Sequence, residues 1–197
     1  MTGTQSESVY SGDMALSEPK NELGLLYLQD ALGRMQGVRE LGEGAMRQLR
    51  QEHWHATLGE GENSVAVLVQ HLSGNMHSRW QYFLEADGES GSRDRDAEFE
   101  ETGLTPDALW HRWNAGWGVF LGVLARLQPA DLTRTLTIRG EVHTVLEAIL
   151  RQIAHYSGHV YQLVFLARHW LGADWQTLSI ARGRSDEFNR RMQARQA

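Results

Sequence analysis

Apolar residues recur at helical spacing through four long segments of the chain, and this periodicity constrains the fold more than any other feature. The segments cover approximately residues 21–50, 63–84, 105–128 and 144–170. Strand signals are nearly absent, apart from residues 133–138 (TRTLTI), which alternate β-branched with other residues before a glycine. The pattern predicts an all-α fold, a four-helix bundle with a short extended segment near 133–138.

Residues at the segment boundaries are of the types that begin and end helices. Thr105 can cap the third helix, and Pro106 suits its first position. Thr144 and Glu147 fit a capping box at the start of the fourth helix, and Gly172 follows its last apolar residue. The third and fourth helices are therefore expected to have locally fixed ends.

The segments between and around the helices differ in composition. Residues 1–20 are largely polar, so we expect a flexible leader followed by a single bundle domain over residues 21–197. Residues 85–104 are charged and contain glycines, and we expect a long crossover loop held to the surface by ion pairs. A weakly amphipathic stretch at 185–196 predicts a short C-terminal helix.

The composition excludes several kinds of site and partner. The chain has no cysteine, which excludes disulfides, thiolate metal ligands and a cysteine nucleophile, and its nine histidines make nitrogen the obvious metal donor. A formal charge of −6 with scattered basic residues argues against a nucleic-acid partner. No apolar run approaches the roughly 20 residues of a membrane helix, and the N-terminal residues lack a signal-peptide core. We therefore expect a cytoplasmic protein without a membrane partner.

Two histidines, His155 and His159 in the run HYSGH, lie four residues apart in the middle of the fourth predicted helix. Both imidazoles leave the same side of the helix about one turn apart, so they can hold one divalent metal ion if another helix supplies a third ligand. His71, in the middle of the second predicted helix, is the best candidate. All three flank the apolar stripe of their helix, which suits a partly solvated pocket with an open coordination position.

Polar residues in line with these histidines are candidates for a substrate pocket. Asn75, Ser78 and Tyr82 lie in line with the histidine of the second helix, and Gln162 lies in line with the pair of the fourth. The pattern lacks the glutamate of the zinc-protease motif HExxH, because Tyr156 occupies that place. Histidines on helix flanks are also common structural residues, so a bundle without a metal is the alternative interpretation.

Three segments of the chain carry a family resemblance: NSVAVLVQHLSGNMHSRWQYFLEADGE, RDRDAEFE and QIAHYSGHVYQLVFLAR. Together they resemble the DinB/YfiT-like superfamily of predicted metalloenzymes, and are closest to a bacterial subfamily of undefined function. The resemblance covers about residues 23–170 and is strongest over residues 63–100. It implies a four-helix bundle in which a divalent metal ion, usually zinc or nickel, is bound by His71, His155 and His159.

The resemblance also implies an enzymatic activity. Characterised relatives include transferases and isomerases that use a low-molecular-weight thiol, so we expect a thiol-dependent S-transferase or a hydrolase acting on a small-molecule substrate. Gln162 matches a frequent HxxxHxxQ pattern and is expected to orient a ligand. The alternative is a non-catalytic bundle for binding or dimerisation with structural histidines. The resemblance predicts a homodimer, and so does the excess of apolar residues on the third and fourth helices.

Overall fold

Five α-helices and one two-stranded sheet account for most of residues 19–85 and 93–195, which are the residues that the computed structural model of the chain describes. Most of the expected leader and part of the expected crossover loop lie outside these residues. The helices are α1 (Pro19–Met46), α2 (Val65–Trp80), α3 (Pro106–Leu124), α4 (Val145–Leu171) and α5 (Ser185–Ala194).

The first three helices end four residues earlier than their predicted ends at residues 50, 84 and 128. The apolar pattern continues beyond each helix because residues in the following turns also reach the core. Phe83 and Leu127, for example, are buried although they follow the last helical residue. Apolar periodicity alone therefore overestimates the length of these helices, whereas α4 ends at Leu171, directly before Gly172 as predicted.

Side-chain caps fix the beginnings of three helices. The hydroxyl oxygen of Ser64 accepts a hydrogen bond from Val67 N at the start of α2, at 3.1 Å. At the start of α4, Glu147 N donates to Thr144 Oγ1 at 3.2 Å and Thr144 N donates to Glu147 Oε2 at 2.8 Å, which confirms the capping box. Thr105 caps α3 in the same way, with Ala108 N as the donor.

The extended segment expected near residues 133–138 is half of a hairpin. Strand β1 (Thr135–Ile138) pairs antiparallel with β2 (Glu141–Thr144), and the sequence did not predict the second strand. Arg139 and Gly140 form the two-residue turn with φ angles of 55° and 77°, which belong to the left-handed region that glycine adopts at little cost. The hairpin leads directly into α4.

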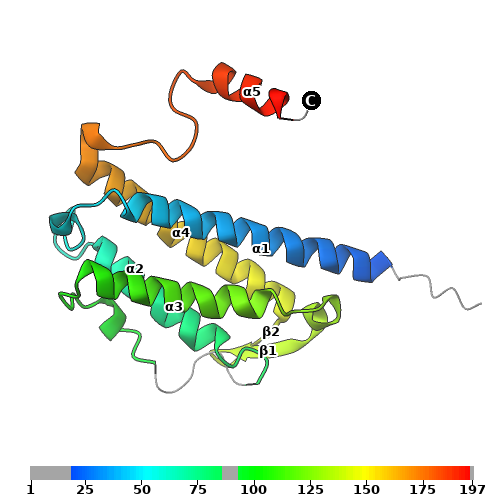
Figure 1. The fold of residues 1–197 in the computed structure, drawn as a ribbon. Helices are drawn as coiled ribbons and strands as arrows, with labels where there is room; N and C mark the ends of the chain where they lie inside the picture. Colours follow the sequence, from blue (N-terminus) through cyan, green and yellow to red (C-terminus); the bar gives the residue numbers. More distant parts are fainter. Residues whose placement is uncertain (1–18, 86–92, 196–197) are drawn as a thin grey trace, which may run out of the picture.

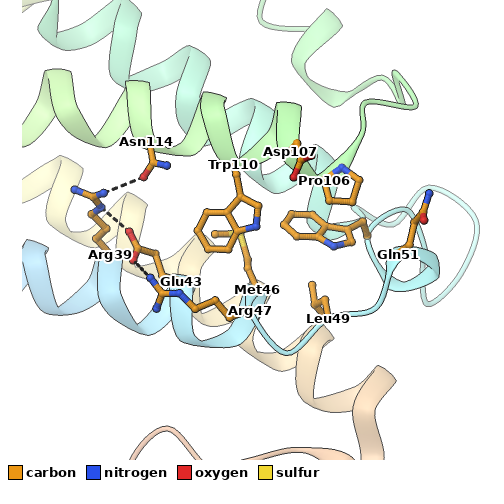
Figure 2. A pocket seen from close by; sticks show the side chains of 11 residues that line it. Arg39, Glu43, Met46, Arg47, Leu49, Gln51, Pro106, Asp107, Trp110 and Asn114 are labelled. Carbon is orange, nitrogen blue, oxygen red and sulfur yellow. Dashed lines mark hydrogen bonds and ion pairs between the residues drawn. The ribbon is translucent and has the colours of Figure 1, made fainter.

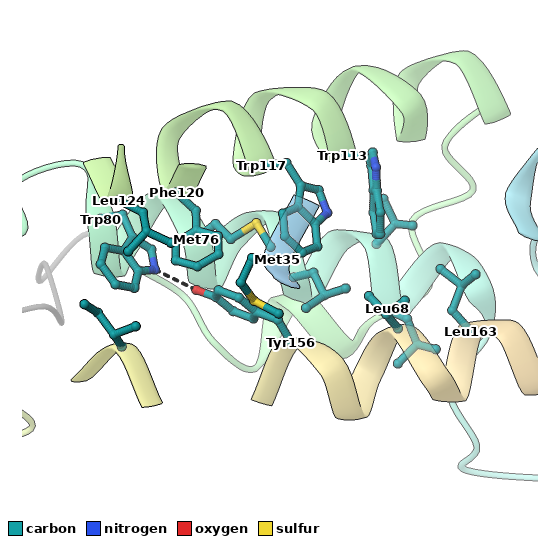
Figure 3. Close-up of a cluster of buried hydrophobic side chains, with 14 of the residues drawn as sticks. Met35, Leu68, Met76, Trp80, Trp113, Trp117, Phe120, Leu124, Tyr156 and Leu163 are labelled. Carbon is teal, nitrogen blue, oxygen red and sulfur yellow. Dashed lines mark hydrogen bonds between the residues drawn. The ribbon is translucent and has the colours of Figure 1, made fainter. Parts of the chain in front are cut away.

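The four long helices pack around one core, with α2 against α3, α1 against α4, and a further contact between α2 and α4 (Figure 1). Figure 3 shows a row of buried aromatic rings that joins α2, α3 and α4. The indole Nε1 of Trp80 donates to the Tyr156 hydroxyl at 2.9 Å, and this hydroxyl donates to Asn75 Oδ1 at 3.0 Å. This chain of hydrogen bonds holds α4 in a fixed register against α2.

The outer parts of the structure carry fewer contacts. Part of the expected crossover loop packs on α2 through the 3₁₀ turn Ala97–Phe99, and Arg93 pairs with Glu98 at 2.7 Å within the loop itself. The expected C-terminal helix is present as α5, whose residues are exposed apart from the half-buried Phe188 (Figure 1). Among the described residues, no helix has the length and apolarity to span a membrane.

Candidate metal centre

Three histidine side chains converge between α2 and α4. His155 Nε2 lies 3.2 Å from His71 Nε2 and 3.1 Å from His159 Nε2. One ring nitrogen from each histidine lies within 4.8 Å of the other two. The three histidines selected from the sequence therefore lie together in the fold, because the pair on α4 presents both rings to His71 of α2.

Two of the three separations between these nitrogens match the requirements of a metal ion. Nitrogen ligands about 2.0 Å from a tetrahedral zinc ion are separated from one another by roughly 3.3 Å. Two separations of 3.1 and 3.2 Å are close to this value. All three ligand nitrogens lie within 4.8 Å of one another, so the three histidines could hold one ion once the rings of His71 and His159 have closed in on it.

The second ring nitrogen of each histidine faces a hydrogen-bond acceptor. His71 Nδ1 lies 3.0 Å from Glu98 Oε2 and His155 Nδ1 lies 3.2 Å from Gln152 Oε1. His159 Nδ1 lies 2.9 Å from Gln162 Oε1. A neutral imidazole carries one N–H group, so each acceptor places that proton on Nδ1 and leaves a lone pair on Nε2.

Three Nε2 lone pairs then point at one another without a shared proton. Such an arrangement is repulsive in itself, and a cation bound by His71, His155 and His159 would offset the repulsion. The placement of the protons on the Nδ1 atoms favours a metal site. Histidines with a purely structural role would pair the N–H donor of one ring with the nitrogen acceptor of the next.

The Glu98 carboxylate is the charged group that contacts one of the three histidines, His71. Burial raises the pKa of Glu98, but hydrogen bonds from His71 and Arg93 outweigh it and lower the pKa below its ordinary value. Arg93 Nε and Nη2 each lie 2.7 Å from one oxygen of this carboxylate. Glu98 is therefore ionised at neutral pH and accepts the His71 proton in a charge-assisted hydrogen bond.

Gly74 makes room for Glu98 on α2. A Cβ atom at position 74 would overlap the Glu98 carboxylate oxygen Oε1. A side chain at this position, about one turn after His71, would therefore displace the Glu98 carboxylate from its place beside the imidazole.

Burial keeps the histidines of α4 neutral. Burial, followed by the charges of His159 and His71, lowers the pKa of His155 to about 3. Burial also lowers the pKa of His159, although its hydrogen bond to Gln162 opposes the shift. Neutral imidazoles are the form that binds metal ions, so proton competition at neutral pH is weak.

The residues predicted for a substrate pocket lie in different places. A cavity of about 360 Å³ opens beside the three histidines, and Asn75 lines it. Gln162 lines a different cavity, and its Oε1 lies 2.9 Å from His159 Nδ1. Ser78 lines a separate cavity on the other side of Arg93, and Tyr82 follows the end of α2 with 56% of its surface exposed.

Sequence reasoning did not select Glu98 or Gln152 as functional residues, nor the arginines that line the cavity. Glu98 belongs to the charged run RDRDAEFE, and no periodic pattern indicates that this run folds back onto α2. For Gln152 there was a signal, since it precedes His155 by three residues just as Gln162 follows His159 by three.

A larger cavity, of about 730 Å³, lies away from the histidines, between the end of α1 and the start of α3 (Figure 2). Trp54 and Trp110 meet there edge to face, with ring centroids 6.3 Å apart. Glu43 holds Arg39 and Arg47 at its rim, so these charges are already paired. Within the described part of the chain, no group of metal-binding side chains lies at the larger cavity, and the histidine centre is the better candidate for chemistry.

The fold and the centre together define a helical protein with a group of three histidines that could hold a metal ion. Residues 22–184 match a family described as a protein of unknown function (DUF1572), and the chain belongs to this family. No curated protein matches the sequence.

Proposed function

We propose that the chain is a metal-dependent enzyme of the DinB-like class, a four-helix bundle whose divalent metal ion is held by His71, His155 and His159. One observation carries this proposal: three Nε2 atoms converge while each Nδ1 is committed to a separate acceptor. The packing of α1 to α4 around one core and the match to a family over residues 22–184 support the bundle.

The centre fits a catalytic site better than a structural one. Structural zinc sites close the coordination shell with four protein ligands, whereas catalytic sites use three and leave a position open. Among the described residues, the group contains three histidines and no carboxylate or cysteine as a fourth member. The cavity beside the histidines supplies space for a substrate at the open position.

The three nitrogen ligands favour metal ions that prefer nitrogen over oxygen. Three neutral nitrogen ligands suit zinc or nickel better than the hard ions magnesium and calcium, which prefer oxygen. A divalent ion held by three neutral ligands keeps its full charge and supplies Lewis acidity that lowers the pKa of a bound water or thiol.

The residues around the centre orient the ligands and limit the access of water. Glu98, Gln152 and Gln162 each fix one histidine in the tautomer with a free Nε2. The Phe99 ring stacks on His71 with centroids 4.5 Å apart and covers that ligand. Tyr156 does not act as a base, because burial raises the pKa of its hydroxyl and the group remains a neutral donor to Asn75.

The reaction class follows from the nucleophile at the open position. A low-molecular-weight thiol as cosubstrate gives S-transfer to an electrophilic small molecule, and water in the same place gives hydrolysis. The absence of cysteine from the chain means that a thiol nucleophile must come from a small molecule. We propose thiol-dependent transfer as the first activity to assay and hydrolysis as the second, in a cytoplasmic protein.

A homodimer is part of the proposal. The exposed side of α4 carries large apolar side chains, and Tyr161 and Phe165 are each 61% exposed. Exposed apolar groups at this spacing suit a contact between two copies of one helix face. The alternative function, a dimerisation module without catalysis, rests on this surface and predicts that removing the metal leaves the dimer intact.

Metal analysis tests the proposal. We expect one zinc or nickel ion per chain after purification, and its loss in His159→Asn. The matched control is His169→Asn, which changes an exposed histidine on the same helix outside the centre. Equal metal content in the wild type and the His159→Asn variant, or no stoichiometric metal in either, would refute the proposal.

A further inference from the structure

The cavity beside the three histidines is strongly basic. Five arginines line it, although the whole chain has only 19 basic residues against 25 acidic ones. Among the described residues, no aspartate or glutamate lines the cavity. The arginines are Arg79, Arg93, Arg95, Arg139 and Arg151.

These arginines come from four separate parts of the fold. Arg79 lies on α2, two residues lie in the segment before the 3₁₀ turn, Arg139 lies at the turn of the hairpin, and Arg151 lies on α4. Cationic groups from four segments repel one another when the fold brings them together, and the repulsion is offset when an anion binds between them. A position at φ 55° in the hairpin turn also favours glycine or asparagine over arginine.

The arginines extend from the metal centre in a defined direction. Helices α2 and α4 run antiparallel, since Leu68 lines a cavity with Leu166 near the end of α4, whereas Trp80 lines one with Ala148 near its start. Arg151 precedes His155 by four residues, so it lies about one turn, roughly 5.4 Å, along α4 toward the hairpin. Arg79 follows His71 by eight residues and lies about two turns along α2 on the same side.

Some of these charges are already engaged within the protein. Arg93 pairs with Glu98, and Arg79 and Arg139 have contacts of their own. Arg151 is exposed and has no ion pair among the described residues. Arg95 stacks over the Phe99 ring at 5.0 Å, and its one ion pair, at 3.6 Å, is with the fully exposed Asp96. Arg151 and Arg95 are thus the groups best placed to bind a ligand directly.

We infer that the cavity binds a small-molecule substrate or cosubstrate with an anionic oxygen group, a carboxylate or a phosphate, at its basic end. This inference rests on the proposed function, because the other end of the molecule then reaches the open position of the metal. The distance between the two ends corresponds to one or two helical turns, about 5–11 Å. Arg151 and Arg95 bind the anion, and the remaining arginines supply the positive potential.

Binding of anionic probes to the metal-free protein tests this inference. Inorganic phosphate and succinate are titrated calorimetrically at low salt, with the uncharged succinamide as the neutral control. We expect both anions, or one of them, to bind while succinamide does not, and the binding to weaken as sodium chloride is raised. The anion that binds more tightly identifies the group that the substrate carries.

Two variants locate the binding. Arg151→Gln is expected to raise the dissociation constant about tenfold, the lower end of the range for the loss of one hydrogen bond to a charged group. Arg168→Gln is the matched control, because Arg168 is exposed on the same helix outside the cavity, and we expect no change. Arg95→Gln, on a different segment, is expected to weaken binding as Arg151→Gln does.

Two results of the phosphate and succinate titrations would overturn the inference. Either neither anion binds more tightly than succinamide, or both bind equally well to the wild type and to the two cavity variants. A failure of the metal proposal can be told apart from a failure of this inference. The His159→Asn variant removes the metal site but leaves Arg151 and Arg95 in place. Anion binding that persists in His159→Asn therefore supports the basic cavity whether or not the wild type holds a metal.

Discussion

Replacing Glu98 with glutamine isolates the charge that supports the metal centre. Glu98→Gln keeps an oxygen that can accept the His71 proton but removes the negative charge, and it leaves Arg93 without its ion-pair partner. Hydrogen bonds to charged groups contribute about 1.5–3 kcal/mol, roughly twice the value for neutral ones. The change should therefore lose about 1–1.5 kcal/mol of metal binding, or a roughly tenfold weaker affinity.

Competition with a chromophoric chelator at pH 7.5 measures this affinity for zinc or nickel. Glu101→Gln is the matched control, because Glu101 pairs with a different histidine, His55, at 2.6 Å. Both variants remove one carboxylate beside one imidazole, and only Glu98 lies beside the centre. Equal affinities for Glu98→Gln, Glu101→Gln and the wild type would refute the reasoning that Glu98 orients and polarises a metal ligand.

Three further predictions test neighbouring parts of the account. Gly74→Ala should displace the Glu98 carboxylate and weaken metal binding about tenfold, measured in the same competition assay, whereas an unchanged affinity would show that Glu98 relaxes without loss. Metal at 100 times its dissociation constant should raise the melting temperature by about 5–10 °C, and His155→Asn should abolish this rise in calorimetry. The metal-free protein should lose stability as the pH falls from about 6.5 toward 3, because His155 takes up a proton near pH 6.5 only when unfolded. A melting temperature that is independent of pH across that window, or falls equally in His155→Asn, would contradict the last prediction.

Much of the fold could be predicted from local sequence signals. Thr144, Glu147 and Gly172 mark the ends of α4 because capping depends on residues that are adjacent in the chain. The same locality explains the pair His155 and His159, since one helical turn fixes their spacing whatever the rest of the fold does. Periodicity failed where tertiary contacts continue the apolar pattern beyond a helix, as at the ends of α1, α2 and α3.

The candidate site depended more on contacts between distant segments. Asn75, Ser78 and Tyr82 share one line on an ideal helix, yet Asn75 turns toward α4 while Ser78 faces the segment that carries Glu98. Tyr82 lies beyond the end of α2, so the helical projection does not apply to it. Glu98 and the arginines reach the centre only because separate segments fold over it, and a single sequence carries no periodic sign of that packing.

X-ray absorption spectroscopy of the zinc-loaded protein shows most directly whether three imidazole nitrogens bind one metal ion. We predict three histidine nitrogens at about 2.0–2.1 Å from the zinc ion, with one or two further light-atom ligands from solvent. In His71→Asn the number of imidazole ligands should fall or the metal should be lost. A spectrum with fewer than three imidazoles in the wild type, or one that His71→Asn leaves unchanged, would contradict the claim.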